Sequence, residues 1–332
     1  GIRLTEWTSC GGCAAKWEPA QLGGLLESVG PDQGFADLLI GISPFDDAAV
    51  YRLSDDLALV STTDFFPPLV DDPADFGAIA AANACSDVFA MGGDVRLALN
   101  LAAFPEQLPL DVIGAILAAA ARVVDAAGGV VAGGHTIRSE EPIFGLAVQG
   151  VVRPHAIFTK GGARVGDRLV ISKPLGTGIA LASKDPVVIA GATAGMRSLN
   201  RDAADTLREH REDVHAVTDV TGFGLAGHAW EMAQRSGTRM VITGPRLPLY
   251  DGVAEAAERG IRTGGNARNR RYLDGRVDVA VDEAVETIAF DPQTSGGLLA
   301  AVAPEAVDAL EAAGFVAIGA ACSGAPAVVL QD

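Results

Sequence analysis

The sequence predicts a two-domain protein of the α/β class, and three observations support that fold class. The chain has 332 residues, more than one compact core of ordinary size contains, so we expect two domains. From about Leu38 onward, short apolar segments typical of strands alternate with segments typical of helices. Hydrophobic residues make up 49% of the chain and glycines number 40, which suits closely packed layers of strands and helices.

The first domain is expected over residues 21–155, after a glycine-rich arm at residues 1–20 whose lack of periodicity predicts mobility. Asp72, as N-cap, and Pro73, at the first helical position, predict a helix that stops at Gly92-Gly93. In order, the elements expected in this domain are strands at 48–53 and 57–62, helices at 73–91 and 110–127, a short strand at 130–132 and a strand at 143–152.

The second domain is expected over residues 156–332, because a connector containing Gly and Pro near residue 155 separates two α/β sets. Its clearest elements are strands at 167–172, 214–218, 298–302 and 315–320 and helices at 225–235 and 304–313.

The charge of the chain limits the kinds of partner that it can bind. Lys and Arg total 25 against 42 Asp and Glu, a formal net charge of −17. A field of that sign repels nucleic acid and anionic membranes, and aromatic residues, at 5%, are too few for stacking platforms. ATP would also be repelled unless cations mediate, so any phosphate chemistry should depend on a carboxylate–metal cluster.

Cysteine use predicts a reduced, cytoplasmic setting. The four cysteines, at positions 10, 13, 85 and 322, are too few and too unevenly spread for a disulfide framework. The N-terminus has no apolar signal core, and glycines and Pro326 divide the long uncharged run at 312–330 into strand-sized pieces. We therefore expect a soluble protein without a membrane span.

Asp47 and Asp64 flank the predicted hairpin. If Asp55-Asp56 form a two-residue loop, strand pairing places Asp47 opposite Asp64, where like charges destabilise the pair unless a divalent cation lies between them. A solvated strand end explains the two carboxylates equally well.

Asp87 lies in an otherwise apolar helical stretch and shares a face with Asn83, four residues earlier. Buried, unpaired aspartates are rare, and Asp has a poor propensity for the middle of a helix. Contact with a metal or a phosphate is therefore favoured over a hydrogen-bonded or capping role.

Two glycine-containing segments follow predicted strands. Asp219 comes directly after the strand at 214–218, where α/β folds commonly bind ligands, although a capped helix-entry turn is an equally good interpretation. Gly133-Gly134-His135-Thr136 is predicted to be a strand-to-turn element whose backbone N–H groups can bind phosphate. By itself, His135 would more often be a structural histidine.

The arm contains Cys10-Gly11-Gly12-Cys13, which fits half of a zinc site or a dithiol redox pair. No second pair of ligands and no preceding strand accompany it, so both interpretations are weak. The other interpretations are a mobile thiol and amine, with Lys16 neutralising phosphate charge, and a tail with incidental cysteines.

Together, eight segments in order resemble the selenophosphate synthetase (selenide, water dikinase) family, within the superfamily of aminoimidazole ribonucleotide synthetase. The resemblance covers nearly the whole chain. Its segments are Cys13–Lys16, Asp46–Tyr51, Thr62–Phe66, Asn83–Asp87 with Ala90–Gly93, Ala132–Thr136, Lys173–Gly178, Thr218–Gly224 and Asp291–Gly297.

The resemblance implies a two-domain aminoimidazole ribonucleotide synthetase-like fold of the α+β type. Its N-terminal domain would bind ATP and Mg²⁺ and form a homodimer through its sheet, with the C-terminal α/β domain beside it. The implied catalytic residues are Cys13 and Lys16, and the implied magnesium ligands are Asp47, Asp87 and Asp219. ATP contacts are implied for Lys16, Pro44, Phe45, Asp46, Asp64 and Asp87 and, from the partner subunit, for Gly134, His135 and Thr136.

The implied reaction converts ATP, selenide and water to selenophosphate, AMP and orthophosphate, with magnesium assisting transfer of the γ-phosphoryl group to selenide. Selenium would arrive as selenide or from a delivery protein. Typical members have a second cysteine before the lysine, and Ala15 stands there in this chain, so a mechanism with adjacent thiols is not supported.

Two alternatives differ in what they leave unexplained. Another ATP-dependent enzyme of the superfamily, such as thiamine-monophosphate kinase, has no need of the Cys-x-x-Lys arm. A thiol-disulfide or metal-binding protein that uses Cys10 and Cys13 leaves the carboxylate motifs unexplained.

Overall fold

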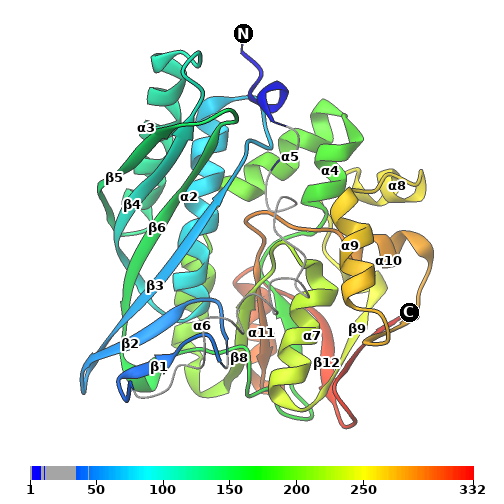
Figure 1. Cartoon of the computed structure of the whole chain (residues 1–332). Coiled ribbons are helices and arrows are strands. Elements are labelled where there is room, and N and C mark those ends of the chain that lie inside the picture. The colour runs from blue at the N-terminus through cyan, green and yellow to red at the C-terminus, as the bar shows by residue number, and fades with distance from the viewer. Residues whose placement is uncertain (1, 9–10, 12–34, 44) are drawn as a thin grey trace. The chain divides into compact units, whose positions relative to one another are not determined.

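The computed structural model describes residues 2–8, 11, 35–43 and 45–332, and the chain divides into two compact units. The first comprises residues 1–157 and 196–199, and the second comprises residues 158–195 and 200–332. Each combines a sheet with helices (Figure 1), so the predicted α/β class is confirmed. Within the described ranges, every helix is too short or too polar to cross a membrane.

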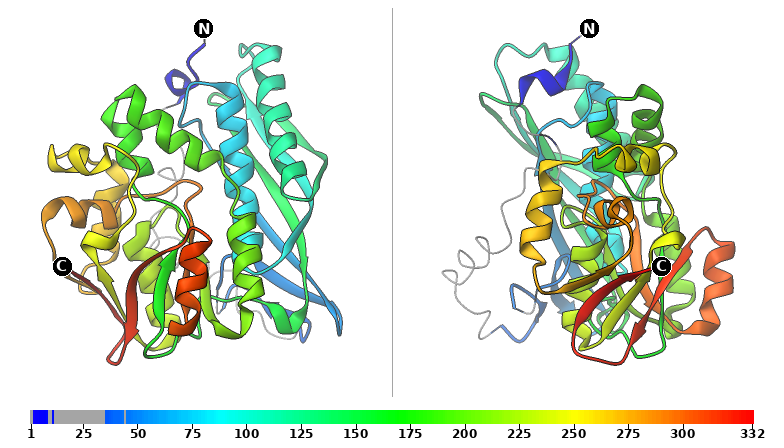
Figure 2. Two further views of the ribbon diagram at one scale, coloured as in Figure 1. Left: turned by 180° about the vertical axis from the view of Figure 1, so that it is seen from behind. Right: turned by 90° about the vertical axis from the view of Figure 1, so that its right-hand side faces the viewer.

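The first unit is a six-stranded sheet with two long helices on one face. The strand order is β1-β2-β3-β6-β4-β5, and α2 and α3 pack against each other and against the strands, as the view from behind shows (Figure 2). The elements are η1 (Leu4–Trp7), β1 (Leu38–Ile40), β2 (Ala49–Ser54), β3 (Leu57–Phe66), α2 (Pro73–Ala90), β4 (Asp94–Phe104), α3 (Leu110–Ala126), β5 (Val130–Arg138), β6 (Ile143–Val152) and η3 (Pro154–Ala156).

Helix α2 begins and ends as the sequence predicts. The carboxylate of Asp72 accepts a hydrogen bond from the backbone N–H of Asp75 at 2.9 Å, and Pro73 occupies the first helical position. After the helix, Gly92 adopts a left-handed conformation with a φ of 74°. The sequence signals at both ends are thus sufficient to delimit the helix that carries Asp87.

The hairpin of β2 and β3 has a different register from the predicted one. Ser54 pairs with Leu57, but an irregularity between Arg52 and Ser54 shifts the ladder by one residue, so that Ala49 pairs with Ser61. Pairing ends at Ala49. Asp47 therefore lies outside the strand and is not opposite Asp64, because a bulge changes the register that a two-residue loop alone would set.

The segment Gly133-Gly134-His135-Thr136 is a strand and not the predicted turn. It lies in β5, which runs parallel to β4 at the edge of the sheet and pairs residues 134–136 with residues 100–102. Gly133 and Gly134 have φ values of 141° and 148°, and a Cβ at Gly134 would lie 2.2 Å from the carbonyl oxygen of Asn100. The glycines permit two backbones to approach closely at an irregular point of the ladder.

The second unit contains a seven-stranded mixed sheet with the order β10-β13-β9-β12-β7-β11-β8. Its six predicted elements correspond to β7, β8, β11, β12, α7 and α11. The elements are β7 (Arg168–Ile171), α4 (Thr177–Ser183), α5 (Pro186–Arg197, of which the last two residues belong to the first unit), α6 (Arg201–Glu209), η4 (Arg211–Asp213), β8 (Val214–Asp219), α7 (Gly224–Ser236), β9 (Arg239–Thr243), η5 (Gly244–Arg246), α8 (Val253–Glu258), α9 (Gly264–Tyr272), β10 (Val277–Ala280), α10 (Glu283–Ala289), β11 (Leu298–Val302), η6 (Pro304–Ala306), α11 (Val307–Ala312), β12 (Val316–Cys322) and β13 (Ala327–Gln331).

Candidate active site

In the first unit, side chains of β3 and α2 form a polar cluster of four residues, which we call the β3–α2 cluster. Thr62 Oγ1 donates to Asp87 Oδ2 at 2.5 Å, and Asn83 Nδ2 donates to Asp64 Oδ2 at 2.6 Å. Thr62 and Asp64 are two residues apart on a strand, and Asn83 and Asp87 are about one turn apart on a helix. The predicted common face of Asn83 and Asp87 is confirmed, and it is the face toward β3.

Asp47 and Asp87 form a carboxylate pair that fits a hard divalent cation. A carboxylate oxygen of Asp47 and one of Asp87 lie within 4.8 Å of each other. Two oxygens bound to one Mg²⁺ lie at most about 4.2 Å apart, because each bond is about 2.1 Å long. Both residues are half-buried, and the hydroxyl of Thr62 orients the Asp87 carboxylate. Only a small adjustment would bring both oxygens onto one ion.

Cys85 lies on the same helix but is not a candidate nucleophile. Its side chain is fully buried, and burial together with the negative charge of Asp87 raises its pKa to about 12. The thiolate, which is the reactive form, is therefore not populated near neutral pH.

The other predicted site residues of the first unit are not part of the β3–α2 cluster. Phe45 and Asp46 are in the loop before β2, where Asp46 Oδ1 accepts from the backbone N–H of Asp47 at 3.0 Å. Residues 134–136 are on β5, which β6 and β4 separate from β3. The predictions for Cys10, Cys13, Lys16 and Pro44 concern positions outside the described residues.

In the second unit, Asp219 is the last residue of β8, and the turn after it leads into α7, as predicted. Asp219 is 2% exposed, and its Oδ2 has no hydrogen-bond partner among the described residues. A buried carboxylate oxygen without a donor is costly unless a cation compensates its charge. Asp219 is therefore also suited to bind a metal.

Lys173 follows β7 and is a candidate site residue, because it interacts electrostatically with Asp219; the sequence analysis singled out its segment but gave this residue no role. Its Nζ donates to the carbonyl oxygen of Ser295 at 2.9 Å. Burial lowers the pKa of Lys173 to about 7, against the opposing effect of the negative charge of Asp219. Ser295 itself has a φ of 50°, and a left-handed conformation outside glycine often marks a functional loop. The sequence signal that could have identified Lys173 is a lysine directly after a predicted apolar strand.

The segments Lys173–Gly178 and Asp291–Gly297, which the sequence singled out without a role, hold each other in place. Gln293 Oε1 accepts from the backbone N–H groups of Gly176 at 2.9 Å and Thr177 at 3.0 Å. Asp291 Oδ2 accepts from the backbone N–H of Ile179 at 3.1 Å, and burial raises the pKa of Asp291 to about 7. These hydrogen bonds tie the loop that begins at Lys173 to the loop that contains Asp291 and Gln293.

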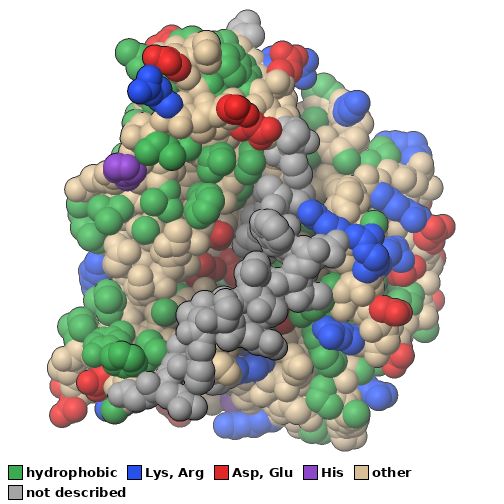
Figure 3. Space-filling model, viewed as in Figure 1, with side chains coloured by type: hydrophobic (Ala, Val, Ile, Leu, Met, Phe, Trp, Pro, Cys, Tyr) green, Lys and Arg blue, Asp and Glu red, His purple; other side chains and the backbone are tan. Residues whose placement is uncertain are grey.

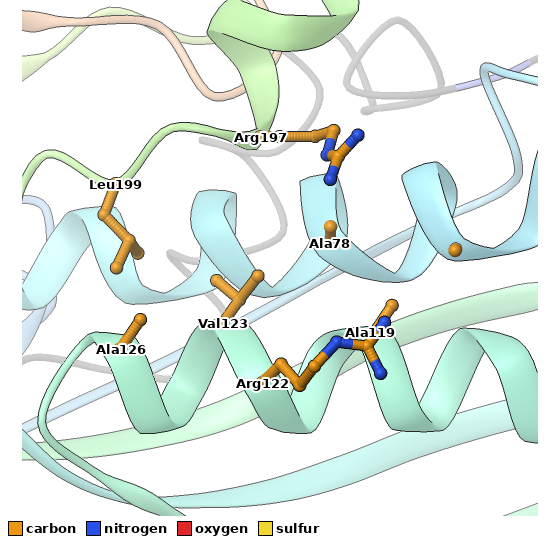
Figure 4. Close-up of a pocket in the computed structure, with 8 residues that line it drawn as sticks. Ala78, Ala119, Arg122, Val123, Ala126, Arg197 and Leu199 are labelled. Carbon is orange, nitrogen blue, oxygen red and sulfur yellow. The ribbon is translucent and has the colours of Figure 1, made fainter.

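Two further surface features include none of the predicted site residues. A cavity of about 290 Å³ between α2 and α3 has Arg122 and Arg197 among its lining residues and contains none of the predicted site residues (Figure 4). Lys and Arg side chains gather over α9, which carries Arg268, Arg270 and Arg271 (Figure 3). Part of that charge is balanced, because Arg270 pairs with Glu286.

Comparison with protein families matches both units. Residues 45–152 match the N-terminal domain, and residues 164–321 the C-terminal domain, of AIR synthase related proteins. A selenide, water dikinase of Myxococcus xanthus is 45% identical over 345 residues, which cover 98% of this chain and 96% of that protein. Proteins of the same name from Caldanaerobacter subterraneus and Clostridioides difficile are 43% and 42% identical, each over 93% of this chain and 90% of the relative.

Solved structures with the same fold are more distant in sequence. Thiamine monophosphate kinase from Aquifex aeolicus has a TM-score of 0.69 at 21% identity, over 94% of this chain and 96% of that one. A chain of the HypE–HypF complex has a TM-score of 0.67 at 17% identity, over 93% and 95%. These likenesses confirm the predicted aminoimidazole ribonucleotide synthetase-like fold.

Proposed function

The chain belongs to the selenide, water dikinase family, and we propose that it makes selenophosphate, AMP and orthophosphate from ATP, selenide and water. It is an ATP-dependent phosphotransferase. The observation that carries the proposal at the level of residues is the β3–α2 cluster, in which hydrogen bonds orient Asp64 and Asp87 while Asp47 lies beside Asp87.

Asp47 and Asp87 would hold Mg²⁺, and Asp219 is included as a ligand because of its motif and its buried oxygen. A bound Mg²⁺ supplies charge stabilisation at the phosphate oxygens. This role agrees with the charge of the chain, since a protein with a net charge of −17 needs counterions to bind ATP. Thr62 contributes by fixing Asp87 Oδ2.

Phe45, Asp46 and Asp64 are proposed to contact ATP. The loop with Phe45 and Asp46 leads to Asp47, and Asp64 is joined to α2 through Asn83. The proposed nucleotide contacts therefore adjoin the proposed metal ligands. Pro44 belongs to the same proposal.

Cys13 and Lys16 are proposed to be the reactive thiol and the phosphate-neutralising amine. Support comes from the described residues before them. Arg3 Nε donates to Asp71 Oδ2 at 2.9 Å, and Gly11 packs so closely that a Cβ there would lie 2.3 Å from the carbonyl oxygen of Pro68. The start of the arm is thus attached just beyond β3, the strand that carries Asp64.

In the proposed transfer, selenide attacks the γ-phosphorus of ATP. A selenium–phosphorus bond forms, the bond between the γ-phosphorus and the β–γ bridging oxygen breaks, and ADP is the leaving group. Water then attacks the β-phosphorus of ADP, which releases orthophosphate and AMP. Hydroselenide is already a strong nucleophile, so the chain needs no strong general base. The task of Lys16 would be to balance phosphate charge while water is excluded from the γ-phosphate.

We also propose a homodimer in which Gly134, His135 and Thr136 reach the ATP site of the partner subunit. Two strands separate β5 from β3, about 14 Å at about 4.8 Å per strand, so these residues are remote from Asp64 within one unit. On the sheet face opposite α2, the apolar side chains of Phe65 (55%) and Ile137 (54%) are exposed. Exposed apolar side chains of this kind are expected where a second copy of the chain packs in a symmetric dimer. Sedimentation equilibrium tests the dimer; a monomer at micromolar concentration contradicts it.

The proposed setting is the cytoplasm, with selenium supplied as selenide or by a delivery protein. Both selenide and the thiol of Cys13 require reducing surroundings. Activity with free selenide in the absence of any other protein would show that delivery is dispensable in vitro.

One assay tests the reaction directly. The protein is incubated with ATP and MgCl₂, with and without selenide, and the phosphorus products are followed by NMR. We expect AMP and selenophosphate in equal amounts and only with selenide. ADP as the sole product, formed without selenide, would point to another kinase of the superfamily. Cys13→Ser is expected to stop turnover while ATP binding persists, and Cys10→Ser is its matched control.

A further inference from the structure

Four buried polar side chains in the second unit form a chain that leads to the turn after Asp219. Lys160 Nζ donates to Glu231 Oε2 at 2.9 Å, and His228 Nδ1 lies 3.4 Å from the same oxygen. Thr221 Oγ1 lies 3.3 Å from His228 Nε2. Each of the four residues is at most 7% exposed. We call them the Thr221–Lys160 network.

The ion pair at the inner end of this network fixes a negative charge. Burial by itself would raise the pKa of Glu231, but the charge of Lys160 and the interaction with His228 lower it to about 2. Glu231 is therefore an anion over the whole physiological range of pH. Buried ion pairs of this kind contribute little net stability compared with apolar side chains of similar volume, so a role other than stability is indicated.

The anion favours a proton on the ring nitrogen of His228 that faces it. His228 Nδ1 lies 3.4 Å from Glu231 Oε2, an electrostatic contact without hydrogen-bond geometry, and a carboxylate attracts an N–H more than a nitrogen lone pair. With the proton on Nδ1 alone, Nε2 is the ring nitrogen that accepts from the hydroxyl of Thr221, 3.3 Å away. Phe223 stacks on the ring, with centroids 5.6 Å apart and planes at 27°, which restricts its rotation.

Thr221 is the one polar side chain between Asp219 and helix α7. The backbone of this turn is held from the other side. The carbonyl oxygen of Thr221 accepts from the backbone N–H of Gln293 at 3.0 Å, and Asn269 Nδ2 donates to the carbonyl oxygen of Gly222 at 3.1 Å. The backbone bonds and the contact with His228 therefore restrain the turn through its main chain and through its one polar side chain.

We propose that His228 is a positioning residue for the metal–nucleotide site: with Glu231 behind it, it fixes the Thr221 hydroxyl and thereby the turn that presents Asp219. The inference rests on the proposed role of Asp219 as a magnesium ligand. Groups that orient a ligating carboxylate typically change metal affinity by about 10- to 100-fold when they are removed. An effect of that size is expected here.

Matched substitutions separate the two contacts of the imidazole ring. His228→Gln carries an amide near the position of Nε2 and can still bind Thr221, whereas His228→Asn carries its amide near Nδ1 and cannot. Thr221→Ser keeps the hydroxyl, and Thr221→Val removes it while keeping the shape. Each full-length variant is titrated with MgCl₂ in the presence of a non-hydrolysable ATP analogue by calorimetry, and its thermal unfolding is recorded.

Thr221→Val and His228→Asn are expected to raise the half-saturating magnesium concentration by about tenfold or more. Thr221→Ser and His228→Gln should stay within about threefold of the parent chain. Equal magnesium dependence in Thr221→Val and Thr221→Ser would overturn the proposal, whatever their melting temperatures, because these two differ only in the methyl and hydroxyl groups.

A separate assay of the parent chain keeps this inference apart from the proposed reaction. If the parent chain binds the analogue with magnesium but forms no AMP with selenide, the proposed reaction fails and the positioning role stands. If it turns over selenide and none of the variants shifts magnesium binding, the positioning role fails alone.

Discussion

The two units position their candidate site residues by different means. In the first, the side chains project from regular elements: Asp64 lies on β3 and Asp87 on α2, and single hydrogen bonds from Asn83 and Thr62 orient them. In the second, Asp219 and Lys173 lie where strands end, and buried side chains from distant segments hold the loops. Regular structure suffices for the first arrangement, whereas the second depends on many tertiary contacts.

The two units also differ in net charge. The first has 20 acidic and 8 basic residues, a net charge of −12, and the second has 22 and 17, a net charge of −5. The only lysine in the sequence of the first unit is Lys16, whereas Lys160 and Lys173 are buried in the second. In the second unit, Lys160 therefore compensates the buried charge of Glu231 from within the protein. For the more acidic first unit, we expect compensation by bound cations.

The largest effect is expected at the carboxylate pair of the first unit. Asp87→Ala should lower the selenide-dependent rate by at least about a thousandfold, since a metal ion contributes several kcal/mol to such a transfer. It should also abolish magnesium-dependent ATP binding, measured by calorimetry. Asp94→Ala, an exposed acidic residue of the same unit, is the control. Magnesium-dependent binding that survives Asp87→Ala would remove this residue from the metal site.

In the buried pair Lys160–Glu231 of the second unit, replacing one residue should lower the free energy of unfolding more than replacing both. Glu231→Gln leaves Lys160 buried without its counter-charge and should lower the free energy of unfolding by about 3–5 kcal/mol. Replacing both residues together, Lys160→Met with Glu231→Leu, should cost much less. Urea unfolding measures both, and a double variant as unstable as the single one would show that packing, not charge, is decisive.

Asp291 should make the stability of the chain depend on pH. Its pKa is about 7 in the folded chain, against 3.8 for an unperturbed aspartate, so between these values the folded state holds a proton that the unfolded state has released. The free energy of unfolding should therefore fall as pH rises from about 4 to about 7, by at most about 1.4 kcal/mol per pH unit from this group. Asp291→Asn should flatten that slope in thermal or urea unfolding between pH 5 and pH 7; an unchanged slope contradicts the raised pKa.

The smallest effects should come from two helical glycines of the first unit. A Cβ at Gly77 would lie 2.2 Å from the carbonyl oxygen of Ile116, so Gly77→Ala should force α2 from α3 and cost about 1–3 kcal/mol. At Gly114 a Cβ meets nothing within 4 Å, so Gly114→Ala should stabilise the chain by about 0.5–1 kcal/mol. Equal changes in urea unfolding would mean that the close approach of the two helices is not rigid.

Local patterns were sufficient for the two-domain α/β class, for the start of α2 at Asp72-Pro73, for the common face of Asn83 and Asp87, and for Asp219 at the end of a strand. Caps, helical periodicity and the order of strands and helices act over a few residues, so they are visible in the sequence. Strand β4 was not predicted at all, because its run of Leu and Ala has no clear alternation.

Only the tertiary structure decided the register of the hairpin, the strand at Gly133-Gly134 and the network behind Thr221. The bulge near Arg52 displaced Asp47 by one residue, and the two glycines proved to permit the approach of another strand. Lys160 and Glu231 are 71 residues apart, so no local pattern could pair them. The physical reason is common to all three. Each depends on which distant segment of the chain packs against the strand or turn, and that packing is decided only when the whole domain folds.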